Sequence, residues 1–137
     1  MARVCVDTTF LSPLVRERPE ARKQIEDWRG RGDILVTTEL NRFETLLGIL
    51  REDAGKRREA YLERLDVVLA TIEALPISTE AVTTAARRQA ELYRKGEPAG
   101  VMDLLIAATA RVGGCDSIAT ANVEDFERIG LLPVRGH

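Results

Sequence analysis

Three short strand-like runs alternate with much longer segments of helical character, and this alternation limits the fold more than any other feature. The runs cover residues 3–6, 34–36 and 117–120. None of them alternates apolar and polar residues as a strand with one solvent-exposed face does. Strands buried on both faces require helices on either side of a parallel sheet. The sequence therefore predicts an α/β fold of three layers, with a short, mostly parallel central sheet flanked by helices.

The segments between these runs carry helical spacing and recognisable ends. We expect long helices over residues 19–30, 38–50, 56–71, 79–94 and 101–112, and short helices after Asp7 and Asn122. Thr8 or Thr9 is expected to cap the first short helix, and Asn122 with Asp125 to form a capping box on the last. Pro133 restricts residues 132–134 to an edge strand. No repeat or linker is evident, so residues 1–137 are expected to form a single domain.

Composition excludes several kinds of chemistry. The net charge of −2 is ordinary and gives no sign of a strongly basic nucleic-acid binder, although an acidic site offsets basic patches in such a sum. Cys5 and Cys115 form no CxxC motif, which argues against structural zinc. The one histidine, His137, is the last residue, so a histidine-based triad has no second candidate. No signal peptide or long apolar stretch is seen, and we expect a cytoplasmic protein without a membrane segment.

Polar residues follow the predicted strands at the points where the strands end. Asp7 ends the first, Thr37 and Thr38 the second, and Thr120 the third. The carboxyl ends of parallel strands meet at one edge of the sheet, which is where such folds bind ligands. The sequence therefore predicts that these side chains converge there.

Acidic residues near this edge have both structural and functional explanations. Asp103 is the only charge among residues 101–110, so we expect it to be buried and to need a partner or a metal. It is equally explained as an acid favoured at a helix N-terminus. Asp7 has the same ambiguity as a helix cap, and periodicity alone does not choose between Glu44 and Glu39.

Residues 120–126 allow a similar choice. Asn122 and Asp125 serve either as caps or as oxygen ligands beside a metal, and the two functions are compatible. Oxygen ligands without histidine or cysteine favour a hard cation, Mg²⁺ or Mn²⁺. Such a site suits phosphodiester hydrolysis, in which the cation polarises the phosphate and activates water for in-line attack.

Four motifs in order along the chain resemble those of PIN-domain ribonucleases, specifically the VapC-type toxins of toxin–antitoxin pairs. The motifs cover residues 4–9 (VCVDTT), 44–48 (ETLLG), 102–110 (MDLLIAATA) and 120–126 (TANVEDF). The second motif, a glutamate followed four residues later by glycine, selects Glu44 over Glu39. The resemblance implies a PIN-like fold and a metal pocket of Asp7, Glu44 and Asp103.

The same resemblance implies roles beyond the metal ligands. The fourth acidic position of the family falls at or near Asn122, which carries no charge, and Asp125 is the candidate to supply the extra carboxylate. Thr120 and Thr8 resemble hydroxyl residues that orient ligands or water. We therefore take Asp7, Glu44, Asp103, Asn122 and Asp125 as the candidate catalytic set of an Mg²⁺- or Mn²⁺-dependent endoribonuclease.

The resemblance also implies partners: an RNA substrate, a small antitoxin that covers the active-site groove, and a second copy of the chain in a homodimer. Apolar helices within residues 38–71 would suit the antitoxin, although we expect most of their apolar stripes, such as Leu40, Phe43, Leu47 and Leu50, to pack into the chain's own core. For RNA contact the basic candidates are Lys56, Arg57, Arg58, Arg87, Arg88, Arg94 and Lys95.

Three other functions compete with this hypothesis. A receiver domain of a response regulator also holds Mg²⁺ at a sheet edge, but no acidic pair follows the first strand and no lysine follows a late one. A phosphatase with an aspartate nucleophile requires a DxD motif, whereas Asp7 is followed by Thr8 and Thr9. The main alternative is a catalytically inactive PIN-like RNA-binding or scaffold module, against which the intact Asp7, Glu44 and Asp103 argue.

Overall fold

The computed structural model describes residues 1–136, and His137 lies outside the described residues. Its central sheet has five strands in the order β3-β2-β1-β4-β5, and all four pairings are parallel. The strands are β1 (Arg3–Val6), β2 (Ile34–Thr38), β3 (Glu73–Leu75), β4 (Ser117–Ala119) and β5 (Val134–Arg135). The helices are α1 (Thr8–Val15), α2 (Pro19–Gly30), α3 (Glu39–Glu52), α4 (Gly55–Leu69), α5 (Thr79–Arg94), α6 (Val101–Val112) and α7 (Val123–Ile129). The predicted α/β fold is confirmed.

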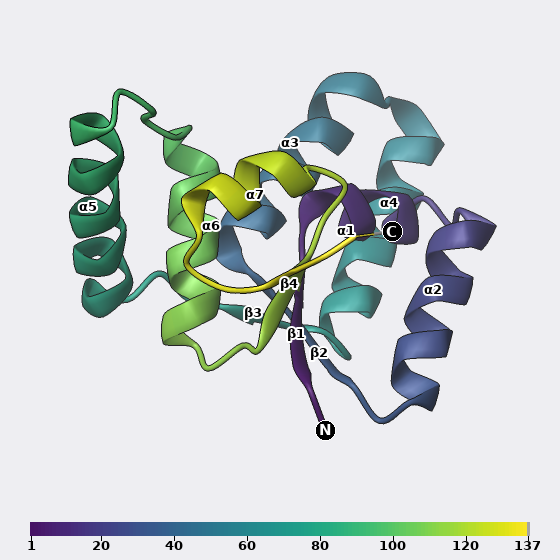
Figure 1. Ribbon diagram of the computed structural model, residues 1–137. Coiled ribbons are helices and arrows are strands. Elements are labelled where there is room, and N and C mark those ends of the chain that lie inside the picture. Colours follow the sequence, from purple (N-terminus) through teal and green to yellow (C-terminus); the bar gives the residue numbers. More distant parts are fainter. Residues whose placement is uncertain (137) are drawn as a thin grey trace.

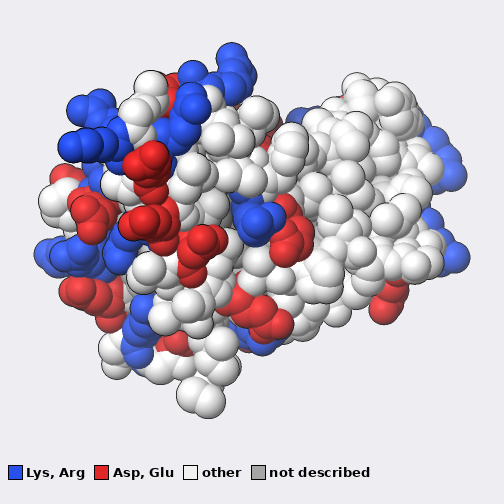
Figure 2. All heavy atoms as spheres, turned by 180° about the vertical axis from the view of Figure 1, so that it is seen from behind, with Lys and Arg blue, Asp and Glu red and all other residues white. Residues whose placement is uncertain are grey.

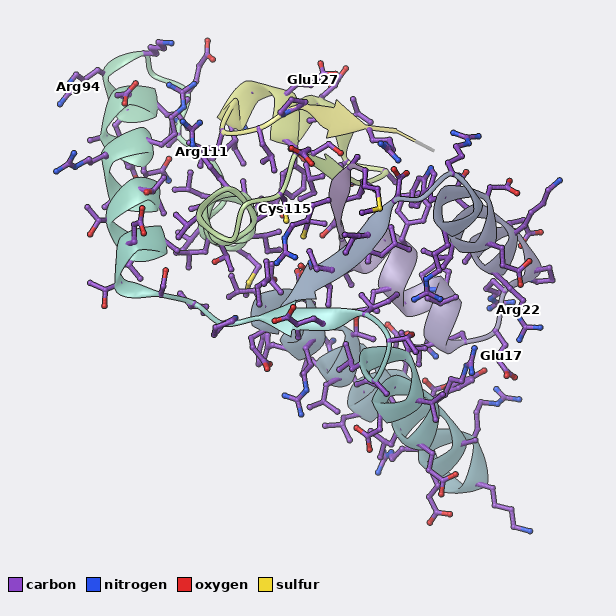
Figure 3. The ribbon with its side chains drawn as sticks, turned by 90° about the horizontal axis from the view of Figure 1, so that it is seen from below. Glu17, Arg22, Arg94, Arg111, Cys115 and Glu127 are labelled. Carbon is purple, nitrogen blue, oxygen red and sulfur yellow. The ribbon has the colours of Figure 1, made fainter. Side chains whose placement is uncertain are left out.

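Two apolar cores lie on opposite faces of the sheet, because successive side chains of a strand point to opposite faces. Cys5 of β1 belongs to the core formed with α5, α6 and α7, whereas Val4 and Val6 belong to the core formed with α1, α2 and α4. Figure 1 shows these helix groups on either side of the sheet, with α5 as the outermost helix against α6. Cys115 is partly buried and packs against the core on the α6 side (Figure 3). The three predicted layers are thus present.

Hydroxyl side chains cap two of the long helices. Thr38 accepts a hydrogen bond from the backbone N–H of Asn41 at the start of α3, and Ser78 accepts one from Ala81 at the start of α5. The predicted caps of the two short helices are wrong. Asp7, and not Thr8 or Thr9, occupies the N-cap position of α1, and its side chain makes no capping bond.

The predicted capping box of α7 is also wrong. Asn122 stands at the N-cap position, but its side chain makes no capping bond. Gly130 ends this helix with φ 66°, a left-handed conformation that glycine adopts without strain. The last strand lies at Val134–Arg135 rather than at residues 132–134. It is at the edge of the sheet as predicted, and Pro133 has no N–H to donate but accepts from the backbone of Ile118 at 3.0 Å.

The apolar stripe of α3 faces outward more than the sequence predicted. Leu40 is buried with 8% of its surface exposed, but Phe43, Leu47 and Leu50 are 53%, 40% and 45% exposed. Seen from behind, charged side chains gather over the half of the molecule that carries α2 and α4, and much of the other half is uncharged (Figure 2). Helical periodicity predicted that these residues lie on one face of the helix, but not whether that face packs against the core.

Through residue 136, no helix has the length and apolar character needed to cross a bilayer.

Candidate active site

Asp7 lies at the centre of the carboxyl edge of the sheet. It directly follows β1, and its backbone N–H donates to the carbonyl of Ala119 in β4 at 3.0 Å. The side chain is buried, with 3% of its surface exposed. Its Oδ1 accepts a hydrogen bond from Asn41 Nδ2 at 2.8 Å, and its Oδ2 accepts one from Thr120 Oγ1 at 2.7 Å. These neutral donors fix the carboxylate without cancelling its charge.

Asn41 is a site residue that sequence reasoning missed. It is fully buried on the first turn of α3, and its Nδ2 also lies 3.0 Å from Thr8 Oγ1. Thr38 fixes the amide, because its hydroxyl donates to Asn41 Oδ1 at 2.7 Å while accepting from the backbone N–H of Asn41 at 3.1 Å. The available signal was its place at the carboxyl edge, three residues before Glu44 and therefore on the same helix face.

Glu44, and not Glu39, faces the same edge. Its Oε1 accepts a hydrogen bond of 2.7 Å from Thr8 Oγ1. Partial burial and repulsion from Asp7 raise the pKa of Glu44, while the bond from Thr8 opposes this rise. Glu39 is exposed and pairs with Arg42 at 3.5 Å. The geometry thus selects the same glutamate as the motif spacing.

Asp103 reaches the site from a different helix, because it lies on the first turn of α6. Burial raises the pKa of Asp103 to about 6, with further contributions from the charges of Asp7, Glu44 and Asp125. The prediction that Asp103 is buried was only partly correct, because it is half-buried and Asp7 is the fully buried carboxylate. Asp103 sits where α6 opens toward solvent, since Val101 in the same turn is 66% exposed.

The closing motif forms the rim of this site. Thr120 is fully buried and links the central carboxylate to the closing motif. Its hydroxyl donates to Asp7 and accepts from the backbone N–H of Asn122 at 3.0 Å. Asp125 is exposed and pairs with Arg128 at 3.7 Å, yet it lies near enough to raise the pKa of Asp103. The side chain of Asn122 is exposed, and no hydrogen bond recorded for residues 1–136 joins it to the carboxylates. The structure therefore brings Asp125 toward the site but not the amide of Asn122.

The three inner carboxylates lack basic partners. Among the ion pairs of residues 1–136, none involves Asp7, Glu44 or Asp103. Uncompensated negative charge in a partly buried pocket favours the binding of either protons or a metal cation. No group of three or more acidic, histidine or cysteine side chains in this part of the chain is arranged to hold a metal by itself. The donors nevertheless fit Mg²⁺, which commonly binds one or two carboxylates and keeps its remaining ligands as water.

The basic candidates for RNA contact divide into two groups. Arg58 donates to the carbonyls of Asp53 and Leu50 at 2.9 and 3.2 Å, so it stabilises the turn between α3 and α4. Arg88 donates to the carbonyl of Ile129 at 2.6 Å. The others are exposed, namely Lys56, Arg57, Arg87, Arg94 and Lys95. Figure 3 shows Arg94 pointing outward from the far end of α5.

Comparisons with known proteins bear on the family and the fold of the chain. Residues 4–132 match the family described as the PIN domain. The Ribonuclease VapC1 of Rickettsia felis is 33% identical over 94% of this chain and 92% of that protein. The tRNA(fMet)-specific endonuclease VapC of Shigella flexneri is 27% identical over 96% of each chain.

Solved structures share the fold at lower identity. VapBC2 from Rickettsia felis bound to a promoter DNA fragment matches with a TM-score of 0.83 and 20% identity over 98% of both chains. DNA-bound VapBC from Salmonella typhimurium matches with a TM-score of 0.80 and 25% identity over 99% of this chain and 98% of that one. The resemblance thus extends over almost the whole chain.

Proposed function

The chain belongs to the PIN domain family, and we propose that it is a divalent-metal-dependent endoribonuclease, the toxin of a VapBC-type toxin–antitoxin pair. The observation that carries the proposal is the convergence of Asp7, Glu44 and Asp103 at one sheet edge without a basic partner. Relatives named ribonuclease or endonuclease support RNA as the substrate. We place its action in the cytoplasm, with residues 1–137 as one PIN domain.

Mg²⁺ or Mn²⁺ is the proposed cofactor. Asp7, Glu44 and Asp103 would hold it, directly or through its water ligands. When bound, such a cation neutralises charge on the scissile phosphate and lowers the pKa of water. The protein residues orient the ligands beforehand: Asn41 and Thr120 fix both oxygens of Asp7, and Thr8 fixes Glu44. Ligands held in this way lose little conformational freedom when the cation binds.

Asp125 and Asn122 act at the rim in this proposal. The Asp125 carboxylate adds negative charge beside Asp103 without entering the pocket, so it attracts the cation and interacts with its water ligands. Asn122 carries no charge at the family's fourth acidic position, and its amide is free to contact the same water ligands or the phosphate.

Two protein partners accompany this function in our proposal. The antitoxin would lay an apolar helix in the groove between α4 and the pair α1 and α2. Two adjoining cavities of about 310 and 280 Å³ there share Arg64 and Val67. The exposed stripe of Phe43, Leu47 and Leu50 on α3 would meet a second copy of the chain in a homodimer. VapBC complexes among the structural neighbours support the antitoxin.

The direct test is cleavage of a mixed RNA pool by the purified protein with Mg²⁺, with Mn²⁺ or with EDTA. We expect cleavage with either metal, none with EDTA, and a loss of at least about a hundredfold in Asp103→Asn. Asp27→Asn, an exposed Asp on α2, is the matched control and should cut normally. RNA binding without cleavage in any metal would instead indicate the inactive PIN-like binding or scaffold module.

A further inference from the structure

A cavity of about 320 Å³ lies beside the acidic site, between α1 and the start of α2. Its lining residues are Thr9, Phe10, Pro13, Arg18, Glu20, Ala21 and Gln24. The floor is apolar and rigid: Phe10 and Ala21 are buried, and the ring of Phe10 packs against Trp28 with 4.9 Å between centroids. Such a cavity, apolar below and polar at its mouth, is typical of sites that bind small organic ligands.

Thr9 joins this cavity to the acidic site. Its hydroxyl accepts a hydrogen bond from the backbone N–H of Ala121 at 2.9 Å and lies 3.5 Å from Asp7 Oδ2. The same side chain therefore lines the cavity and contacts both the central carboxylate and the closing loop. A strand whose phosphate lies at the carboxylates would have its neighbouring nucleotide at the cavity mouth.

The polar groups at the mouth are available to a ligand. Within residues 1–136, the side chains of Arg18, Glu20 and Gln24 form no hydrogen bond or ion pair. The turn before α2 explains why Arg18 has no acidic partner, because the neighbouring Glu17 pairs with other arginines. Glu17 adopts φ 58° and directs its carboxylate to Arg22 and Arg64, at 4.0 and 3.8 Å.

Figure 3 shows Glu17 and Arg22 together at this turn. The backbone N–H of Arg18 meanwhile donates to the carbonyl of Pro13 at 2.9 Å, which ties these two lining residues together. Arg18 thus places a positive charge at the mouth of the cavity. The other lining residues are apolar or neutral, except for Glu20.

We propose that this cavity receives one unpaired nucleobase of the RNA, next to the scissile phosphate, and so sets the sequence preference of cleavage. Single-stranded RNA is commonly recognised by splayed bases that stack on flat side chains and hydrogen-bond through their edges. Pro13 and the Arg18 guanidinium supply flat faces, and Gln24 and Glu20 supply the donors and acceptors that read the base edge. The inference rests on the proposed nuclease function.

The test compares cleavage-site profiles on a randomised single-stranded RNA pool, mapped by sequencing the product ends. Gln24→Ala is expected to weaken the base preference at one position beside the cut by roughly five- to tenfold, the effect of losing one hydrogen bond. Arg18→Ala is expected to raise the RNA concentration needed for half-maximal cleavage. Its matched control is Arg31→Ala, which removes the same charge at the opposite end of α2.

The outcomes separate this inference from the nuclease proposal. An unchanged profile in Gln24→Ala and Arg18→Ala, with wild-type cleavage intact, would overturn the base pocket and leave the nuclease standing. An equal rise in the RNA concentration for half-maximal cleavage in Arg18→Ala and Arg31→Ala would also overturn the base pocket. Both arginines would then act only through general electrostatic attraction of RNA. Wild-type protein that cuts no RNA with metal would overturn both proposals.

Discussion

Replacing Asp103 by asparagine is expected to stabilise the metal-free protein at neutral pH. Burial, and then repulsion from Asp7, Glu44 and Asp125, raises the pKa of Asp103 from its ordinary 3.8 to about 6. Because the folded state binds this proton more tightly than the unfolded state, stability is lost as the pH rises through this window. Above it, the ionised carboxylate destabilises the folded protein, and the neutral amide of asparagine does not.

The size of this effect follows from the shift. A rise from 3.8 to about 6, at roughly 1.4 kcal/mol per pKa unit, corresponds to about 3 kcal/mol. Asp103 is only half-buried, so screening by solvent reduces this to about 1–2 kcal/mol. Asparagine also loses roughly 0.5 kcal/mol of favourable interaction with the N-terminus of α6. We therefore expect a net gain of about 1 kcal/mol in the free energy of unfolding at neutral pH.

Urea denaturation followed by circular dichroism, in buffer with EDTA, measures this difference. The gain should be present at about pH 7.5 and absent near pH 4, where the wild-type carboxyl is mostly protonated in the folded state. Asp27→Asn on α2 should show no comparable gain. Added Mg²⁺ should stabilise the wild type and not Asp103→Asn, since binding to the folded state alone stabilises it. A variant that is less stable at neutral pH, or a gain that grows toward pH 4, would refute the reasoning.

Four other variants probe the structure around the site and the proposed dimer surface. Asn41→Ala leaves Oδ1 of the buried Asp7 carboxylate without its donor, so we expect a loss of about 2–3 kcal/mol in urea denaturation and a cleavage rate at least about tenfold lower. Thr38→Ala and Ser78→Ala each remove a helix cap and should each cost about 1 kcal/mol, but only Thr38→Ala should slow RNA cleavage, because only Thr38 fixes that amide. The double variant Phe43→Glu/Leu47→Glu should be monomeric by light scattering and remain folded; a dimer of unchanged mass would contradict the proposed α3 interface.

The convergence of Asp7 and Thr120 was predictable from the sequence because it depends only on where buried parallel strands end. The strands are short and apolar, and their carboxyl ends meet at one edge whatever the details of the helices. The capping of α1 was not predictable in this way. Asp7 leaves its helix uncapped because partners 34 and 113 residues away take its two oxygens. Rules for helix capping consider only residues that are close in the sequence, and they therefore predicted Thr8 or Thr9 as the cap of this helix.

Asn41 and the α3 stripe show two further limits of sequence reasoning. An asparagine in the first turn of a helix has the same local pattern whether it is solvated or hydrogen-bonds a buried carboxylate; only tertiary packing distinguishes the two. Helical periodicity likewise placed Phe43, Leu47 and Leu50 on one face without indicating whether that face meets the core or a partner. Both features depend on contacts between elements that are distant in the sequence.

The most direct test of the central claim is a Mn²⁺ titration in which bound metal and RNA cleavage are followed on the same samples. Electron paramagnetic resonance reports free Mn²⁺, and the initial rate of RNA cleavage reports activity. We predict that cleavage rises in step with metal bound to the wild type, and that Asp103→Asn loses both together while Asp27→Asn keeps both. Full cleavage by Asp103→Asn, or by wild-type protein in EDTA, would contradict the assignment of Asp7, Glu44 and Asp103 as the metal-dependent active site.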